Sequence, residues 1–290
     1  MKPRALIKRF RIDNPRQFRL ADHDPAETAG FDKGGAEKLA AAQTERLTDL
    51  QQRLYAEHTW ALLVILQGID AAGKDSAIRR VTAGLNPQGC IVHPFRQPTD
   101  AELDHSFLWR AVQRLPPRGD IGIFNRSYYE DVVTVRVHRG LRDAERLPSK
   151  LITPRIWQER FDDINAFERH LLRNGTAVLK FYLNISKDEQ KQRLMARLDE
   201  PNKFWKASMS DVADRRLWPR HMAAYQEMIR HTSTPEAPWH IVPADHKWFA
   251  RAVITTAIAD ALERLRVDFP KPDRSRLREL KQIRKALKKT

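Results

Sequence analysis

Cysteine is nearly absent from this chain of 290 residues: Cys90 is the single one, so no disulfide can form within the chain. Long apolar runs are also missing. The longest extends from Ala61 to Leu66, whereas a membrane-spanning helix needs about 18 apolar residues or more. The opening residues, MKPRALIKRFRIDNP, contain no apolar stretch like that of a secretory signal. We therefore expect a cytoplasmic protein without a membrane partner.

Basic residues are abundant, and the net charge is +15. Five of these charges lie in residues 1–11, and eight more are the excess over residues 264–290. Residues 12–263 carry only the remaining +2. A polyanion site in the middle of the chain must therefore come from local placement of charge, and we expect no specific nucleic-acid partner.

Short apolar runs recur along the chain, rich in β-branched and aromatic residues. They are ALLVIL (61–66), CIVHPF (90–95), DIGIFN (120–125), AVLKFYL (177–183) and WHIVPA (239–244). Each is separated from the next by enough chain for a helical crossover, which is typical of a parallel sheet covered on both faces. The sequence predicts an α/β protein with three α/β/α layers and a five-stranded parallel sheet.

Helix signals fit this spacing. TDAE (99–102) is a capping box that opens an amphipathic run ending before Pro116, and helices are predicted over 154–173 and 246–266. We expect an N-terminal extension and helix over 1–52, a core over 53–266 with an inserted helical lid at about 186–221, and a basic tail over 267–290.

Residues 68–76, GIDAAGKDS, form a G-x-x-x-x-G-K pattern directly after the first apolar run and before a helical segment. This strand, loop and helix arrangement points backbone N–H groups at a phosphate. We predict that the segment, called the phosphate loop below, binds phosphate through Gly68, Ala71, Ala72, Gly73, Lys74, Asp75 and Ser76.

The position after Lys74 usually holds Ser or Thr as a magnesium ligand, but here it is Asp75, and Asp70 lies inside the loop. A carboxylate beside a phosphate is repulsive unless a cation lies between them. We therefore predict Mg²⁺ with Asp70 as a direct ligand and Asp75 as a direct or water-mediated one. For Asp75, stabilisation of the helix dipole remains the alternative.

Polar residues end the third apolar run, in IFNRSYYED (123–131). The carboxyl ends of parallel strands form the ligand crevice of open α/β sheets. We predict that Asn125, Arg126, Glu130 and Asp131 lie on the acceptor side of the site, with Arg126 contacting the transferring phosphate. The alternative for Glu130 and Asp131 is that they belong to a capped helix start and are simply solvated acids.

Residues 186–221 carry nine Lys/Arg against six Asp/Glu. A basic flap over a phosphate loop excludes water and neutralises charge in the transition state. Arg193 and Arg197 are the predicted catalytic arginines of this lid, with a solvated helical hairpin as the alternative.

Together these motifs resemble the type-2 polyphosphate kinases. Further matching segments are LNPQG (85–89), FRQPT (95–99), FLWR (107–110), LKFYLNISKDEQ (179–190) and APWHIVPADHKWF (237–249). The resemblance implies a thymidylate-kinase-like P-loop kinase core with a lid. It also implies that Asp70 is the aspartate that holds the metal and that Lys74 is the phosphate-binding lysine. Asn125 and Arg126 match the family's motif at the end of the third strand, called the strand-three motif below. Arg193 and Arg197 match arginines of the lid.

The same resemblance implies Mg²⁺-dependent phosphoryl transfer between inorganic polyphosphate and a nucleotide. FNRSYYED is similar to the class III group, which accepts AMP and ADP and forms ATP; Glu130 stands where the diphosphate-specific group has Asn. We also expect a homo-oligomer, a dimer or a tetramer. The alternatives are an ATP-dependent nucleotide kinase on the same fold and a nucleic-acid-binding protein that uses its basic ends.

Overall fold

The computed structural model describes residues 1–289, apart from the side chain of Arg139. One parallel sheet with strand order β2-β3-β1-β4-β5 lies at its centre. The strands are β1 (Ala61–Gln67), β2 (Cys90–Pro94), β3 (Ile121–Asn125), β4 (Thr176–Asn184) and β5 (Trp239–Pro243). Each predicted strand agrees with the observed one to within one residue at either end, so the α/β class and the five-stranded parallel sheet are confirmed.

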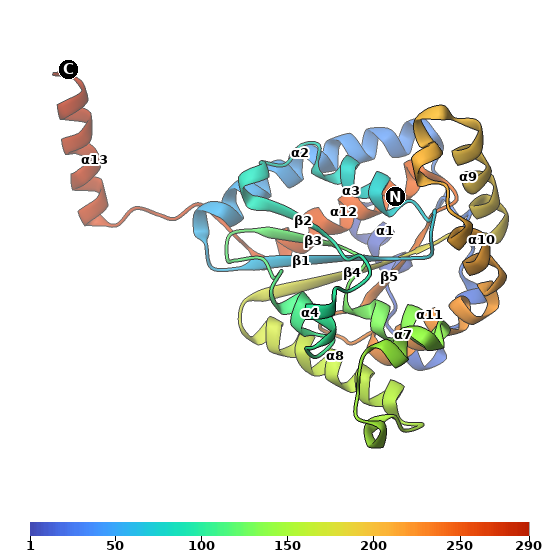
Figure 1. Cartoon of the computed structure of the whole chain (residues 1–290). Coiled ribbons are helices and arrows are strands. Elements are labelled where there is room, and N and C mark those ends of the chain that lie inside the picture. The colour runs from blue at the N-terminus through green and yellow to red at the C-terminus, as the bar shows by residue number, and fades with distance from the viewer. Residues whose placement is uncertain (290) are drawn as a thin grey trace.

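Helices cover both faces of the sheet (Figure 1). One layer contains α2 (Lys33–Glu57), α3 (Lys74–Thr82) and α12 (Lys247–Leu265), and α2 packs along α12. The other layer contains α8 (Ile156–Arg173) and α11 (Trp218–Thr232), which contact one another. Strand β1, in the middle, is buried along its whole length, as expected for a strand covered on both faces.

The helices predicted over 154–173 and 246–266 correspond to α8 and α12. The predicted boundary between residues 52 and 53 falls inside α2, and α2 packs on α12. The helix of the predicted N-terminal extension is therefore part of the helical layer over the sheet.

The first residues also belong to the sheet region. Helix α1 (Pro3–Phe10) packs on α12, and the N–H of Ile12 donates to the carbonyl of Trp239 at 2.9 Å. Arg11 forms an isolated antiparallel bridge with His240 of β5. This segment covers the edge of β5, which would otherwise expose unpaired backbone groups.

The single helix expected from Thr99 to Pro116 was wrong. The capping box is present, but it opens only the short α4 (Asp100–Leu103), and α5 (Trp109–Val112) follows after a break. Asp104, His105 and Ser106 lie in the break. These are weak helix formers whose side chains compete for backbone groups, and the His105 ring bonds the Ala101 carbonyl at 2.8 Å. Cys90 is half-buried on the edge strand β2.

The remaining helices lie between these elements or after them in the chain. The α-helices are α6 (Thr134–Val137), α7 (Arg139–Ala144), α9 (Lys187–Asp199), α10 (Met209–Arg216) and α13 (Arg274–Leu287). The 3-10 helices span Pro15–Gln17, Leu20–Asp22, Pro87–Gly89, Tyr128–Asp131, Ser149–Leu151 and Pro201–Lys206. Residues 187–216, within the predicted lid, are thus two α-helices joined through a 3-10 helix.

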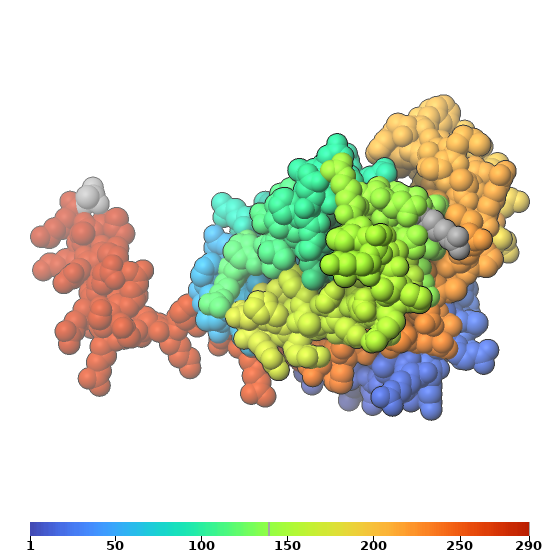
Figure 2. Space-filling view, turned by 60° about the horizontal axis from the view of Figure 1, so that its bottom comes forward, coloured from blue at the N-terminus to red at the C-terminus, as the bar shows by residue number. Residues whose placement is uncertain are grey.

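Helix α13 stands apart from the rest of the molecule, as Figures 1 and 2 show. It contains most of the basic tail, and its apolar residues Leu277, Leu280 and Ile283 are exposed. None of the helices within residues 1–289 combines the length and apolar character that crossing a membrane requires.

A buried ion pair joins β4 to α8. The ammonium group of Lys180 lies 2.6 Å from Glu168 Oε2 and also donates to the Thr232 carbonyl at 2.7 Å. The other oxygen of Glu168, Oε1, accepts from the hydroxyls of Tyr128 at 2.9 Å and Tyr129 at 2.7 Å. Lys180 and Glu168 are at most 2% exposed. The Tyr-Tyr pair that follows β3 is thereby fixed to the neighbouring strand and helix.

Replacing Lys180 with methionine is expected to lower the free energy of unfolding by about 3–5 kcal/mol, because Glu168 would keep a buried charge without its partner. The measurement is urea unfolding. The double variant Glu168→Gln/Lys180→Met should recover part of the loss, since it removes both charges. A single variant within about 1 kcal/mol of wild type would show that the pair is not important for stability.

Candidate active site

The phosphate loop joins β1 to α3 through a backbone that only certain residues adopt easily. Gly68 has φ of 152° and Gly73 has φ of 107°, both in the range that favours glycine. A Cβ at Gly68 would lie 3.0 Å from the Leu183 carbonyl oxygen, so β4 also restricts this position to glycine. Ala71 has φ of 65°. The turn thus directs the chain into the first turn of α3, where anions bind.

Lys74 is buried in the loop. Its ammonium group donates to the carbonyl oxygens of Gly68 at 2.6 Å and Ile69 at 3.2 Å. Burial, assisted by the positive charge of Arg126, lowers the pKa of Lys74 to about 8. Phosphate would supply a stronger anionic partner at this position.

Three charged side chains meet beside Lys74. Arg126 donates to Asp70 and, through its other terminal nitrogen, to Glu130 at 3.0 Å. Glu130 chiefly, with Asp70, raises the pKa of Arg126. Burial opposes ionisation of Asp70, but the attraction of Arg126, Lys74 and Arg197 outweighs it and lowers the pKa of this carboxyl. Asp70 is therefore an anion and Arg126 a cation.

The backbone also holds Arg126 in place. Its φ of 64° is unusual for a residue other than glycine, and its N–H donates to the Leu66 carbonyl at 3.0 Å. Such a conformation costs about 1–3 kcal/mol and clusters at functional sites. The turn directly after β3 therefore points Arg126 toward the loop that follows β1.

Asp75 and Asn125 contact each other across the crevice. The Asn125 amide donates to Asp75 Oδ1 at 2.8 Å, and the ammonium group of Lys206 lies 3.7 Å from Asp75 Oδ2. The Asp75 side chain is 72% exposed. The hydroxyl of Ser76 donates to the Gly73 carbonyl at 2.9 Å, so this side chain lies against its own helix turn.

Arg193 lies behind the phosphate loop. Its guanidinium donates to the carbonyls of Ala71, Ala72, Ala244 and Asp245 at 2.5–3.0 Å and to Glu189 at 2.8 Å. These bonds connect α9 to the loop and to the end of β5. These contacts fit a role for Arg193 in positioning the phosphate loop better than a role in contacting the transferring phosphate.

Arg197, one turn further along α9, has a different environment. It donates to Asp211 of α10 at 2.9 Å and to the Lys206 carbonyl at 3.2 Å. It also contributes to the lowered pKa of Asp70, which places it within electrostatic reach of the site. Figure 2 shows the α9–α10 region as a lobe at one side of the molecule.

Asp131, predicted to lie on the acceptor side, is half-buried. Burial raises its pKa to about 7, although Arg110 and Arg160 favour the anion. Its Oδ2 atom has no hydrogen-bond partner among the described residues. The backbone carbonyl of Asp131 accepts from Arg160 at 2.8 Å. Asp131 thus carries a proton through much of the range below neutral pH.

A cavity of about 1020 Å³ adjoins this charge network. Its lining includes Arg126, Glu130 and Asp131 as well as Asp214 of α10 and Arg220 of α11. Its volume is at the upper end of the range for small-molecule sites. Arg110, over the ring of Phe95 at 5.2 Å, adds a positive charge to the lining.

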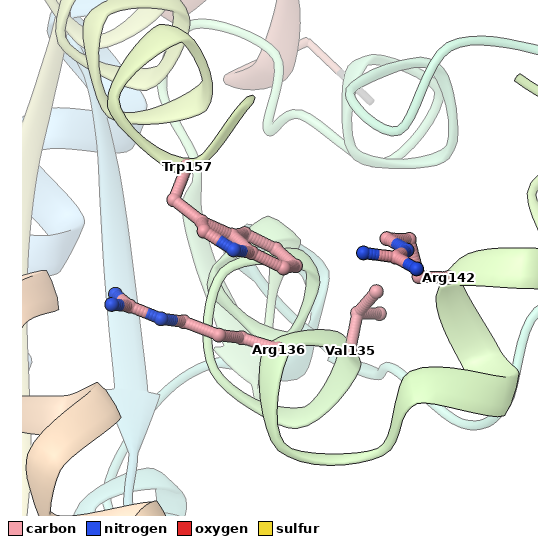
Figure 3. Close-up of a pocket in the computed structure, with 4 residues that line it drawn as sticks. All are labelled: Val135, Arg136, Arg142 and Trp157. Carbon is pink, nitrogen blue, oxygen red and sulfur yellow. The ribbon is translucent and has the colours of Figure 1, made fainter. Parts of the chain in front are cut away.

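A second cavity of about 340 Å³ is lined by Val135, which also lines the first, and by Arg136, Arg142 and Trp157. Figure 3 shows Trp157 and Arg142 facing each other, with the guanidinium of Arg136 directed away from Arg142. This cavity contains no residue of the phosphate loop or of the strand-three motif. It is therefore separate from the candidate active site.

Sequence reasoning missed residues that support the site from a distance. Tyr225 of α11 is buried, and its pKa is raised well above its usual value, by burial first and then by Glu130. Gln190 of α9 donates to the Asp70 carbonyl at 3.0 Å. Gln190 is the last residue of the matching segment LKFYLNISKDEQ, but nothing in that segment indicated its role, and Tyr225 lies in none of the quoted motifs.

The parallel sheet, the glycine-rich loop with its buried lysine, and the paired charges at the carboxyl ends of β1 and β3 define a P-loop kinase. A model of the polyphosphate kinase 2 (PPK2) family matches residues 31–270. The chain belongs to the polyphosphate kinase 2 family, and it is an enzyme that transfers phosphoryl groups.

Individual relatives agree with this assignment. The chain is 46% identical to an ADP-polyphosphate phosphotransferase of Rhodopseudomonas palustris over 87% of this chain and 88% of the relative. It is 43% identical to an AMP/ADP-polyphosphate phosphotransferase of Meiothermus ruber over 92% and 97%. A crystal structure of polyphosphate kinase 2 from Arthrobacter aurescens superposes with a TM-score of 0.88 at 40% identity, covering 98% of this chain and 97% of that one.

The raised pKa of Asp131 predicts a pH-dependent cost to stability. The folded state keeps the proton up to about pH 7, whereas the unfolded state releases it near pH 3.9. The contribution of Asp131 to the free energy of unfolding therefore falls by about 2–4 kcal/mol as the pH rises from about 3.9 to about 7. Asp131→Asn should remove that fall.

The check is urea unfolding of both proteins at about pH 5 and about pH 8. Relative to wild type, Asp131→Asn should gain stability at the higher pH. Asp162→Asn, an exposed change on α8, is the control. Identical pH dependence of wild type and Asp131→Asn would contradict the assignment.

Proposed function

We propose that this chain transfers the terminal phosphoryl group of inorganic polyphosphate to AMP and to ADP, with Mg²⁺, to form ADP and ATP. The reaction is reversible in principle. The observation that carries the proposal is the position of the charge network formed by Asp70, Arg126 and Glu130: it lies between the phosphate loop and a cavity large enough for a nucleotide. The relatives' names, one for ADP and one for both acceptors, agree with it.

The donor chain is assigned to the phosphate loop. The loop amides and Lys74 would bind its terminal phosphates, and Lys74 would exchange the Gly68 and Ile69 carbonyls for phosphate oxygens. Arg126 would likewise exchange part of its contact with Asp70 and Glu130 for the transferring group. Arg197 supplies a further positive charge from the lid, and Arg193 keeps the loop in its bound shape.

The residues of the loop fit a divalent cation. Asp70 is ionised, its side chain is one-third exposed, and carboxylate oxygen is the ligand type that Mg²⁺ takes together with phosphate oxygens and water. Asp70 would hold the ion, and Asp75 would bind it directly or through water. When bound, Mg²⁺ neutralises charge on the phosphates.

No protein nucleophile is required. A phosphate oxygen of the acceptor forms a bond to the terminal phosphorus of the donor while the bond to the bridging oxygen breaks, leaving a polyphosphate one unit shorter. Positioning and fixed charges supply the catalysis. With the acceptor in the 1020 Å³ cavity, which Glu130 lines, Asn125 and Glu130 would orient the acceptor phosphate.

With polyphosphate and Mg²⁺ but no ATP, the protein should form ATP from ADP, and ADP followed by ATP from AMP. Chromatographic separation of the nucleotides measures each product. Lys74→Ala is the inactive control, and ATP replacing polyphosphate tests for an ATP-dependent nucleotide kinase. Absence of nucleotide product with both acceptors would refute the proposal.

Asp70→Asn should lower turnover by at least about 100-fold, because the amide removes the anionic metal ligand while preserving size. The variant should unfold at a urea concentration close to that of wild type. Asp162→Asn is the matched control, as before. Normal turnover by Asp70→Asn, at limiting and at saturating Mg²⁺, would contradict the metal-binding role.

The family match and the relatives favour this function over the two alternatives considered from the sequence. Salt-sensitive duplex binding that survives Lys74→Ala and is lost on removal of residues 267–290 would indicate a nucleic-acid role for the tail. The cytoplasmic location and the homo-oligomer, dimer or tetramer, stay predictions.

A further inference from the structure

Two histidines and an aspartate from three separate elements converge at the edge of the 1020 Å³ cavity. His138 lies between α6 and α7, Asp214 belongs to α10, and His221 belongs to the first turns of α11. His138 Nε2 is 2.9 Å from Asp214 Oδ1. One ligand atom from each of the three residues lies within 4.8 Å of the other two.

His221 is buried without a partner. It is only 5% exposed, and neither of its ring nitrogens forms a hydrogen bond to a described residue. Burying an unpaired polar group is costly, and native proteins rarely leave one unsatisfied. One ring nitrogen of His221 lies within 4.8 Å of the ligand atoms of His138 and Asp214.

The rings of His138 and His221 are not stacked. Their centroids are 5.6 Å apart and their planes are inclined by 55°. The arrangement leaves room for an atom between the nitrogens, as a shared ligand requires. An ordinary ion pair accounts for His138 and Asp214 but leaves both nitrogens of His221 unexplained.

We propose that His138, Asp214 and His221 bind a divalent transition metal of the Zn²⁺ class. Two imidazole nitrogens and one carboxylate oxygen form a typical set of three protein ligands, with a fourth position open to water or another small ligand. Mg²⁺ prefers oxygen ligands and would bind elsewhere. This site is therefore chemically different from the one assigned to Asp70.

The position of the site gives it a structural consequence. His138 and Asp214 both line the cavity, and Asp214 belongs to the predicted lid. An ion held by all three residues would fasten α10 to α11 and to the α6–α7 junction. Metal binding should therefore restrain the lid beside the proposed acceptor pocket.

The test uses Co²⁺ as a spectroscopic probe and Zn²⁺ in calorimetry, both added to metal-free full-length protein in excess Mg²⁺, which occupies the oxygen sites. Wild type should bind one ion per chain and show the intense visible bands of tetrahedral Co²⁺. His221→Ala should weaken metal binding by at least about tenfold, because losing even a residue that only orients a metal ligand lowers metal affinity by this much.

Two further variants keep the result interpretable. Asp214→Asn, at a half-buried position on α10, should also weaken Zn²⁺ binding. It serves as the test if His221→Ala fails to fold. His105→Ala, which removes an exposed histidine stacked on Trp109, should bind as wild type does. Weak binding by wild type, or equal binding by His221→Ala and wild type, would overturn the proposal. The readout does not involve phosphoryl transfer, so this outcome is independent of the proposed function.

Discussion

The ion pair between Glu168 and Lys180 connects the interior of the molecule to the residues of the candidate active site. Glu168 accepts hydrogen bonds from Tyr128 and Tyr129, which follow Arg126 by two and three residues. Lys180 fixes Glu168 to β4, the neighbour of β1 in the sheet. Because these groups are buried and mutually satisfied, the chain after β3 has little freedom. The position of Arg126 relative to the phosphate loop depends on this arrangement.

The site itself is balanced in charge before any phosphate binds. Arg126 is shared between Asp70 and Glu130, and Lys74 rests on backbone carbonyls. Under the proposed function, phosphate would replace part of the carboxylate contacts of Arg126 and the carbonyl contacts of Lys74. A cation at Asp70 would relieve the repulsion between its carboxylate and the donor chain.

The predicted lid consists of two unlike halves. In α9, Arg193 fastens the helix to the phosphate loop and to the end of β5. In α10, the residues are half-buried or exposed; Asp211 pairs with Arg197 of α9, and Asp214 contacts His138 outside the lid. The histidine site proposed above would add a third attachment on the acceptor side. Any closing motion therefore has to occur beyond Arg193.

The strands, the phosphate loop and the Asn125–Arg126 motif could be predicted because each is encoded locally, by apolar runs, glycine spacing and polar strand ends. The interrupted segment 99–115 was missed because weak local propensities competed with an amphipathic pattern. Folding decided that Arg193 supports the loop, that Oδ2 of Asp131 is enclosed without a partner, that Glu168 pairs with Lys180 and that His138 meets His221. These pairs come from separate elements, and their energies depend on burial and partners, which no single stretch of chain contains.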